Sequence, residues 1–320
     1  MQSIINNINQ NNKPNCSIIV PVYNSEESLP FLAARLEQVL PEIANLFEVI
    51  LVNDGSSDNS WNVILGLTSK YSWIHAINLM RNSGQHNALL CGIRAANYEV
   101  TITLDDDLQQ PPEEIHKLLA KFNEGYDVVY GSPNKLPHEF WRNFSSRFTK
   151  RIMAYVMGIP NVIIIGPFRV FRTDLRKAFA NYQSPNVIID VLLSWATTKF
   201  AVTHVDEQPR MYGKSNYTFS KLASAAFLVL TGYSTIPLRF ASMLGFAVTL
   251  FGVAVFLYVI IRYILQGSLP GFPFLASIIT IFSGAQLFTL GIIGEYIASI
   301  FNRSTDRPPY VINQEINNTL

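Results

Sequence analysis

The chain has 320 residues, enough for one large domain or two smaller ones, and its 24 Lys and Arg nearly balance its 23 Asp and Glu. The small net charge hides an asymmetry, because residues 1–137 carry 8 basic and 15 acidic side chains, whereas residues 138–221 carry 12 basic and 5 acidic ones. The basic segment leads into the most apolar part of the chain, which disfavours a nucleic-acid partner and favours an anionic partner at a membrane surface.

Cys16 and Cys91 cannot make a disulfide framework, and their spacing is not that of a metal site. We expect both to be small packing residues in a reducing compartment. Residues 1–15 are polar and rich in Asn, without the apolar core of a secretory signal, so we expect a disordered lead-in.

From residue 16 onward, short apolar runs alternate with helix-like segments. We predict strands at residues 17–23, 47–54, 74–79, 100–105 and 127–131, and helices at residues 28–40, 60–69, 86–96 and 112–123. This alternation with short connections predicts an α/β fold, a doubly wound and mainly parallel sheet with helices on both faces. In such sheets, ligands bind outside the carboxyl ends of the strands.

Three adjacent carboxylates, those of Asp105, Asp106 and Asp107, end the fourth predicted strand. A buried strand that ends in three negative charges needs something to offset their repulsion, and a divalent cation is the simplest compensation. Asp105 and Asp107 point to the same side if the chain stays extended. The pattern predicts a Mg²⁺ or Mn²⁺ site, and the alternative is an acidic turn that caps the following helix.

Polar residues also follow the first three predicted strands. They read Tyr23-Asn24-Ser25-Glu26, Asn53-Asp54-Gly55-Ser56-Ser57-Asp58 and Arg81-Asn82-Ser83-Gly84. Each one alone is ordinary turn chemistry, but four such segments at one edge of a sheet indicate a site. No GxGxxG motif follows the first strand and no GxxxxGK[ST] motif occurs, which disfavours dinucleotide oxidoreductases and P-loop enzymes.

Two long uncharged stretches lie near the C-terminus. Residues 240–261 correspond to about 33 Å of helix, enough to cross a hydrocarbon core of about 30 Å, and residues 272–294 form a second stretch after a turn. Neither has an ionisable group at mid-span, which argues against a transporter or channel. Lys214, Lys221, Arg239, Arg303 and Arg307 flank the outer ends, against Arg262 alone between the spans, so both termini are expected to be cytoplasmic.

These features predict five segments. They are a lead-in at residues 1–15, a cytosolic α/β domain at 16–216, a juxtamembrane interfacial region at 217–235, two transmembrane helices within 236–301 (about 238–262 and 272–296) and a cytosolic tail at 302–320.

The motif Ile19-Val20-Pro21-Val22-Tyr23-Asn24, the two loops after the second and third strands, and residues 105–113 together resemble family 2 glycosyltransferases with a GT-A fold. With the two spans, the chain is similar to the polyprenyl-phosphate branch of that family, which includes dolichol-phosphate mannose synthases and undecaprenyl-phosphate glucosyltransferases. The resemblance covers roughly residues 16–305. Ser25, Pro133 and Pro167 depart from residues that are frequent in the family.

The resemblance implies a donor site for a nucleotide sugar. It assigns nucleotide-sugar contacts to Pro21, Tyr23, Asn24, Glu26, Asp54, Gly84, Asp105, Asp106 and Gln109. Asp105 and Asp107 are the implied DxD pair, which would bind the metal, Mg²⁺ or Mn²⁺, and serve catalysis together with Arg142 and Arg169.

The resemblance also implies an acceptor-phosphate site in the basic segment, at Arg142, Ser146, Arg147, Arg210, Lys214 and Ser215. Arg169 lies on a strand-like run, and Asp190 lies in an otherwise apolar helix. Asp190 could orient a basic residue, act as a weak base or form a salt bridge.

The implied reaction is inverting, metal-assisted transfer of a hexose, with glucose as the first choice, from a UDP-sugar to undecaprenyl phosphate at the cytoplasmic face of the inner membrane. The alternatives are a processive polysaccharide synthase and an inactive nucleotide-binding membrane scaffold. Glycines such as Gly245 and Gly252 would allow close helix approach, so we expect a homo-oligomer, with a lipid-sugar flippase and a downstream transferase as further partners.

Overall fold

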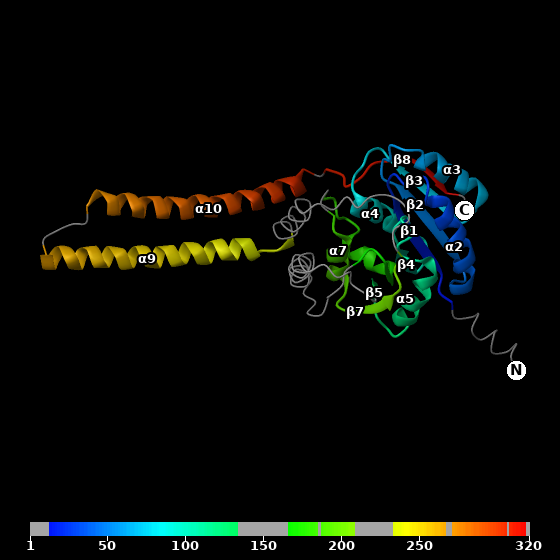
Figure 1. Ribbon diagram of the computed structural model, residues 1–320, viewed down its shortest axis with the longest axis horizontal. Helices are drawn as coiled ribbons and strands as arrows, with labels where there is room; N and C mark the ends of the chain where they lie inside the picture. Colours follow the sequence, from blue (N-terminus) through cyan, green and yellow to red (C-terminus); the bar gives the residue numbers. More distant parts are fainter. Residues whose placement is uncertain are drawn as a thin grey trace. The chain divides into compact units, whose positions relative to one another are not determined.

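A computed structural model describes residues 13–133, 166–184, 187–208, 233–266, 271–305 and 307–317 (Figure 1). The chain forms two compact units. One comprises Met1–Asn216 and Asp306–Leu320, and the other comprises Tyr217–Thr305. The first unit is therefore made of two pieces of chain that are separated in sequence by the second unit.

The described part of the first unit contains one eight-stranded sheet with the order β7-β5-β6-β4-β1-β2-β3-β8. The strands are β1 (Cys16–Val22), β2 (Phe47–Asn53), β3 (Ile74–Leu79), β4 (Val100–Thr103), β5 (Val128–Pro133), β6 (Arg169–Arg172), β7 (Phe200–Val205) and β8 (Ile312–Asn317). Strands β4, β1, β2 and β3 are parallel neighbours, and β5 is parallel to β7. The predicted α/β fold with a mainly parallel sheet is confirmed.

Helices cover both faces of this sheet (Figure 1). They are α2 (Leu29–Ile43), α3 (Ser60–Lys70), α4 (Gln85–Ala95), α5 (Ile115–Phe122) and α7 (Ile189–Ala196), with 3₁₀ turns η1 (Pro112–Glu114) and η2 (Thr173–Phe179). Helices α2, α3 and α5 contribute to one buried cluster, and α4 and α7 contribute to another.

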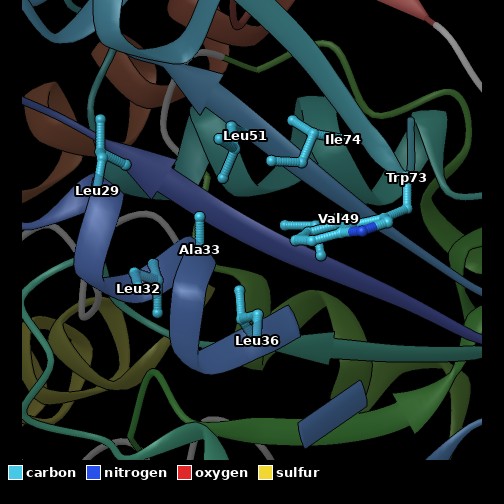
Figure 2. A pocket seen from close by; sticks show the side chains of 8 residues that line it. All are labelled: Leu29, Leu32, Ala33, Leu36, Val49, Leu51, Trp73 and Ile74. Carbon is cyan, nitrogen blue, oxygen red and sulfur yellow. The ribbon is translucent and has the colours of Figure 1, made fainter. Parts of the chain in front are cut away.

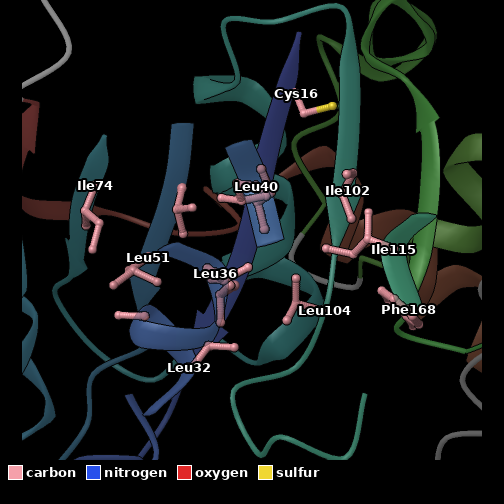
Figure 3. Close-up of a cluster of buried hydrophobic side chains, with 14 of the residues drawn as sticks. Cys16, Leu32, Leu36, Leu40, Leu51, Ile74, Ile102, Leu104, Ile115 and Phe168 are labelled. Carbon is pink, nitrogen blue, oxygen red and sulfur yellow. The ribbon is translucent and has the colours of Figure 1, made fainter. Parts of the chain in front are cut away.

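Side chains alternate between the two faces along each central strand, as the strand period requires. Ile18 and Val20 of β1 pack in the first cluster, whereas Ile19 packs in the second. Figure 3 shows part of the first cluster, in which Leu36 and Leu40 of α2 lie against the strands. Burial of each such aliphatic side chain stabilises the folded state by about 1.5–3 kcal/mol.

A narrow apolar pocket within this cluster lies between α2 and strands β2 and β3 (Figure 2). It is lined by Leu29, Leu32, Ala33, Leu36, Val49, Leu51, Trp73 and Ile74, and it leaves no volume for a water molecule. The pocket is therefore a packing gap of the core and not a ligand site.

Three strands add to the five predicted ones, and one of them, β7, pairs parallel with β5 at one edge. Strand β6 is antiparallel and lies between β4 and β5, so the fourth and fifth predicted strands are not neighbours. Strand β8, which follows the second unit in sequence, pairs antiparallel with β3 and closes that edge. No strand was predicted in this C-terminal region.

The second unit contains two long helices, α9 (Ile236–Gln266) and α10 (Phe272–Ser304). Within them, Ile236–Leu265 and Ile281–Phe301 are long and apolar enough to cross a membrane, with mean hydropathies of 2.6 and 1.3. The two helices contact each other, and a Cβ atom at Gly252 would lie 2.4 Å from the ring of Phe282. Gly252 therefore allows the close approach of this helix pair.

Candidate active site

The loops after β1 and β2 are joined by hydrogen bonds from polar side chains. Asn24 has φ 54°, in the left-handed region that Asn tolerates better than most residues. Its N–H donates to Oγ of Ser56 at 3.0 Å, and its Oδ1 accepts from the N–H of Ser57 at 2.8 Å. Oε2 of Glu26 accepts from the N–H of Asn59 at 2.8 Å. Two residues that the family resemblance assigned to the nucleotide sugar thus connect two neighbouring loops.

Asp54 joins the end of β2 to the loop before α4. It is 3% exposed, and its two carboxylate oxygens accept from the N–H groups of Ser83 at 2.7 Å and Gly84 at 2.9 Å. Burial raises the pKa of Asp54, although the two N–H donors act in the opposite direction. Gly84 has φ 96°, a backbone conformation that a residue with a side chain rarely adopts, so glycine is favoured here.

Gly55 lets the loops after β2 and β3 touch through their backbones. Its φ is 64°, and a Cβ atom there would lie 2.5 Å from both the carbonyl carbon of Arg81 and the nitrogen of Asn82. Both observations require glycine. The contact keeps Asp54 beside its two donors, so the first three loops form one connected edge.

Each carboxylate of the acidic triplet has a different donor from the protein. Oδ1 of Asp105 accepts from Nε2 of Gln85 at 2.7 Å, Oδ2 of Asp106 accepts from the N–H of Tyr23 at 3.3 Å, and Oδ1 of Asp107 accepts from the N–H of Gln109 at 3.0 Å. Burial, with the charge of Asp107 adding to it, raises the pKa of Asp106 to about 6. The donors stabilise the ionised carboxylates, whereas the raised pKa of Asp106 is a consequence of its burial and of the neighbouring charge.

The turn that carries the triplet is strained and anchored at Leu108. Leu108 has φ 62°, which costs about 1–3 kcal/mol for a residue with a side chain. Its side chain is 2% exposed and packs in the first core cluster, and burying a Leu contributes about 1.5–3 kcal/mol. Burial therefore offsets the strain. The turn is also held by Gln110, whose Oε1 accepts from the N–H of Asp105 at 3.1 Å.

The donor set suits a hard divalent cation that shares its shell with a substrate. Asp105 and Asp107 lie on one turn, and the described residues contain no group of three or more His, Cys, Asp or Glu that could hold a metal. Mg²⁺ is commonly bound through one or two carboxylates together with substrate phosphates, not in an all-protein cage. Two carboxylates fit that pattern, with the remaining ligands coming from a diphosphate and water.

The structure brings most of the predicted donor residues to one edge. The residues it places there are Tyr23, Asn24, Glu26, Asp54, Gly84, Asp105, Asp106, Asp107 and Gln109. The side chain of Tyr23 is 47% exposed directly after β1, where an aromatic ring can stack on a base. Pro21 lies inside β1, buried and opposite Val52 of β2, so its contact with a nucleotide stays a prediction.

Arg169 has surroundings that differ from those expected of a phosphate ligand. It is 1% exposed, forms an ion pair with Asp190, and donates from Nε to Oγ1 of Thr103 at 2.9 Å. Burial alone would lower the pKa of Arg169, but the neighbouring carboxylate of Asp190 leaves it raised. A guanidinium so enclosed suits a positioning role better than direct contact with an acceptor.

The other acceptor-site predictions lie outside the described residues. They concern Arg142, Ser146, Arg147, Arg210, Lys214 and Ser215. They stay predictions.

Sequence reasoning missed Gln85 and Gln110, which contact Asp105 through its side chain and its N–H respectively. The only signal for Gln85 was its place directly after the Arg81–Gly84 loop. It also missed Glu207, whose pKa is raised by partial burial and by the charge of Asp107. Gln208 is the next residue, and its N–H donates to the carbonyl of Gln109 at 2.9 Å. The segment after β7 thus approaches the acidic turn.

A mainly parallel α/β sheet with a carboxylate pair after the fourth strand is the arrangement expected of a GT-A glycosyltransferase. The sequence profile described as "Glycosyl transferase family 2" matches residues 17–179. The chain belongs to glycosyltransferase family 2, which also confirms the predicted enzyme class.

Two relatives match nearly the whole chain. An undecaprenyl-phosphate 4-deoxy-4-formamido-L-arabinose transferase of Shewanella sediminis is 35% identical over 92% of this chain and 91% of its own length. An uncharacterized glycosyltransferase of Synechocystis sp. is 31% identical over 93% of this chain and 94% of its own length.

Among solved structures, the fold is similar to that of glucosyl-3-phosphoglycerate synthase from Mycobacterium tuberculosis in complex with Mn²⁺, UDP and glucosyl-3-phosphoglycerate. The TM-score is 0.53 at 13% identity, over 70% of this chain and 80% of that chain. At this identity the likeness concerns the fold.

Proposed function

We propose that this glycosyltransferase transfers a sugar from a UDP-sugar to undecaprenyl phosphate at the cytoplasmic face of the membrane. The observation that carries the proposal is that one chain combines the carboxylate edge after β4 with two helices of membrane-spanning length and composition. A membrane anchor serves a transferase whose acceptor is a lipid. The name of the Shewanella sediminis relative, an undecaprenyl-phosphate transferase, supports this acceptor.

On the donor side, Tyr23 would stack on the base, and Asp105 and Asp107 would hold Mg²⁺ or Mn²⁺ together with the diphosphate. When bound, the ion would supply positive charge to the leaving diphosphate. The complex of the M. tuberculosis synthase with Mn²⁺ and UDP is compatible with this assignment. Gln85 and the N–H of Gln109 would keep the two carboxylates oriented.

On the acceptor side, no strong general base is required. The second pKa of a phosphate monoester is about 6, so the attacking oxygen is largely ionised at neutral pH. The protein needs instead to hold two anionic substrates in line, which gives inversion at the anomeric carbon. We assign this task to residues that all lie within the basic segment, residues 138–221: Arg142, Ser146, Arg147, Arg210, Lys214 and Ser215.

The positive-inside bias supports an orientation with the catalytic unit and both termini in the cytoplasm. We propose glucose as the first sugar to test, on the family resemblance. The pentose derivative 4-deoxy-4-formamido-L-arabinose is the strongest competitor, because it is in the name of the 35% identical relative.

The test is a transfer assay with membranes that contain the full-length protein, undecaprenyl phosphate, Mg²⁺ or Mn²⁺ and a panel of labelled UDP- and GDP-sugars. The panel includes UDP-glucose and the UDP-linked formamido-arabinose. The proposal expects label from one UDP-sugar in the lipid phase, lost in Asp107→Asn. Metal-dependent UDP binding without transfer from any donor would instead support an inactive scaffold, and a water-soluble or growing polysaccharide product would support a processive synthase.

A further inference from the structure

A buried polar cluster lies directly behind the acidic turn. It joins Arg169 of β6, Asp190 of α7, Tyr130 of β5 and Thr103 of β4. Arg169 is 1% exposed, Asp190 is 5% exposed and Tyr130 is fully buried. Oδ1 of Asp190 accepts from Nη1 of Arg169 and from the hydroxyl of Tyr130, the latter at 2.9 Å. Four elements that are distant in sequence therefore meet at one ion pair.

The first connection from this pair to the donor site runs along β4. Thr103 faces Arg169 in the antiparallel register of β4 and β6. Its Oγ1 accepts from Nε of Arg169 at 2.9 Å and donates to the carbonyl of Pro167 at 2.6 Å. Both hydrogen-bonding functions of the Thr103 hydroxyl are thus used by β6 and the residue before it. Thr103 is the last residue of β4, and Asp105 follows two residues later.

The second connection runs through the first turn of α4. Nδ1 of His86 accepts from the N–H of Ile189, the residue before Asp190, at 3.4 Å. Gln85, next to His86, donates to Oδ1 of Asp105 at 2.7 Å. Helix α7 is therefore linked to α4, and α4 holds Asp105. Burial lowers the pKa of His86, although the charge of Asp190 acts in the opposite direction, so the ring is neutral at neutral pH and can accept this hydrogen bond.

A buried ion pair of this kind is weak as a source of stability. Removing both charges in favour of apolar side chains is often neutral or stabilising, whereas removing one charge leaves the other buried without compensation. Asp190 is also occupied by two donors, which makes it poorly placed to take a proton from a substrate. These properties suit an ion pair that holds neighbouring elements in place.

We propose that Arg169 and Asp190 are positioning residues, which hold the end of β4 and the first turn of α4 so that Asp105 is kept in place for the metal and diphosphate. This rests on the proposed function only in that the donor site is the edge at Asp105 and Asp107. Asp190 is then a support of the donor site and not a base. Mutation of a residue that orients a direct metal ligand typically lowers metal affinity or activity by about 10–100-fold.

The test compares Arg169→Met, Asp190→Leu and the double variant in full-length protein purified in mild detergent. We expect each single variant to have a lower melting temperature, and the double variant to regain most of the loss, because no charge is left unpaired. We also expect the double variant to bind UDP in the presence of Mn²⁺ on the order of tenfold more weakly than the parent. A double variant with parental stability and parental UDP affinity would overturn the proposal.

A second comparison separates positioning from acid–base chemistry. Asp190→Asn is expected to raise both the Kd for UDP with Mn²⁺ and the KM for the donor. A loss confined to kcat, with unchanged UDP affinity, would identify Asp190 as a base and overturn the proposal. UDP binding is measured without an acceptor. A parent protein that binds UDP but transfers no sugar would therefore contradict the proposed function. The UDP affinities of the variants would still decide whether Arg169 and Asp190 are positioning residues.

Glu48→Gln is the matched control for general loss of stability. Glu48 is 1% exposed at the start of β2, away from the carboxyl ends of the strands, and its Oε1 accepts from Ser17 at 2.6 Å and from the N–H of Asn97 at 2.7 Å. This change is expected to lower the melting temperature without weakening UDP binding. Weakened UDP binding in this control, to the same extent as in the double variant, would show that any buried polar change has that effect and would overturn the proposal.

Discussion

The side-chain amide of Gln85, at the start of α4, donates to Oδ1 of Asp105, just after β4, at 2.7 Å. This bond connects the loop that follows β3 to the carboxylate that follows β4. Since Asp54 already joins β2 to Ser83 and Gly84 in the same loop, the first turn of α4 connects two strand ends at the donor edge.

We predict that Gln85→Ala weakens Mn²⁺-dependent UDP binding by about tenfold, because Asp105 loses the donor that orients it. Isothermal titration with UDP and Mn²⁺ measures this. Gln38→Ala is the matched control, since Gln38 is an exposed residue of α2 and should leave the affinity unchanged. Parental affinity in Gln85→Ala would show that Asp105 keeps its orientation without this bond.

Metal removal should abolish transfer, and Asp107→Asn should lower kcat by at least about 100-fold. A divalent ion stabilises transition-state charge by several kcal/mol, and each 1.36 kcal/mol corresponds to about a factor of ten in rate. Activity after chelation followed by readdition of Mn²⁺ or Mg²⁺ measures the first effect. Full activity of the chelated enzyme would contradict a metal role for the Asp105 and Asp107 turn.

The central part of the fold could be predicted because its signals are local. The four apolar runs that form β1 to β4 each alternate with one helix-like segment. The polar residues at their carboxyl ends could be placed together because parallel strands end at a common edge of the sheet. The same rule brought Asn24, Asp54 and Asp105 together, although their hydrogen-bond partners could not be foreseen.

The misses depended on distant pairing. The insertion of β6 between β4 and β5 has no local signature, because the Arg169–Arg172 segment lies far along the chain from both strands. Asp190 was expected to orient a basic residue, act as a weak base or form a salt bridge, but nothing in the sequence named Arg169 as its partner. Strand β8 is polar, with the sequence INQEIN, and its pairing with β3 becomes visible only in the folded chain.

His86 should make the stability of the first unit fall as the pH drops below about 6.5, whereas Asp106, whose pKa is raised to about 6, acts in the opposite direction. The pKa of His86 is lowered in the folded protein by burial and by Arg169, whereas Asp190 acts in the opposite direction. Between the ordinary pKa and the lower folded value, the unfolded chain binds a proton that the folded chain does not, so unfolding is favoured by acid.

His86 alone changes the free energy of unfolding by at most about 1.4 kcal/mol per pH unit. His86→Asn, which keeps an acceptor for the N–H of Ile189 but does not titrate, should flatten the slope between pH 5 and pH 6.5, by roughly that amount at most. Chemical denaturation at several pH values measures it. An identical slope in the variant would contradict the assignment of a neutral His86.

Strand β8 should contribute to the stability of the first unit. His75 of β3 is 2% exposed, and its Nε2 lies 2.8 Å from Oε1 of Glu315 on β8. Its other ring nitrogen, Nδ1, is buried without a hydrogen-bond partner among the described residues. Glu315→Ala would leave both ring nitrogens without a protein partner, and an unsatisfied buried polar group costs about 1–3 kcal/mol.

We therefore expect Glu315→Ala to lower the free energy of unfolding by about 1–3 kcal/mol, and truncation after residue 306 to lower it further because the pairing of β8 with β3 is lost. Gln314→Ala is the matched control, since the neighbouring side chain is exposed and points to the other face of the strand. Thermal and urea unfolding of the detergent-solubilised protein measure these differences. If truncation left the unfolding of the first unit unchanged, β8 would be a dispensable addition to the sheet edge, and His75 would be satisfied by water.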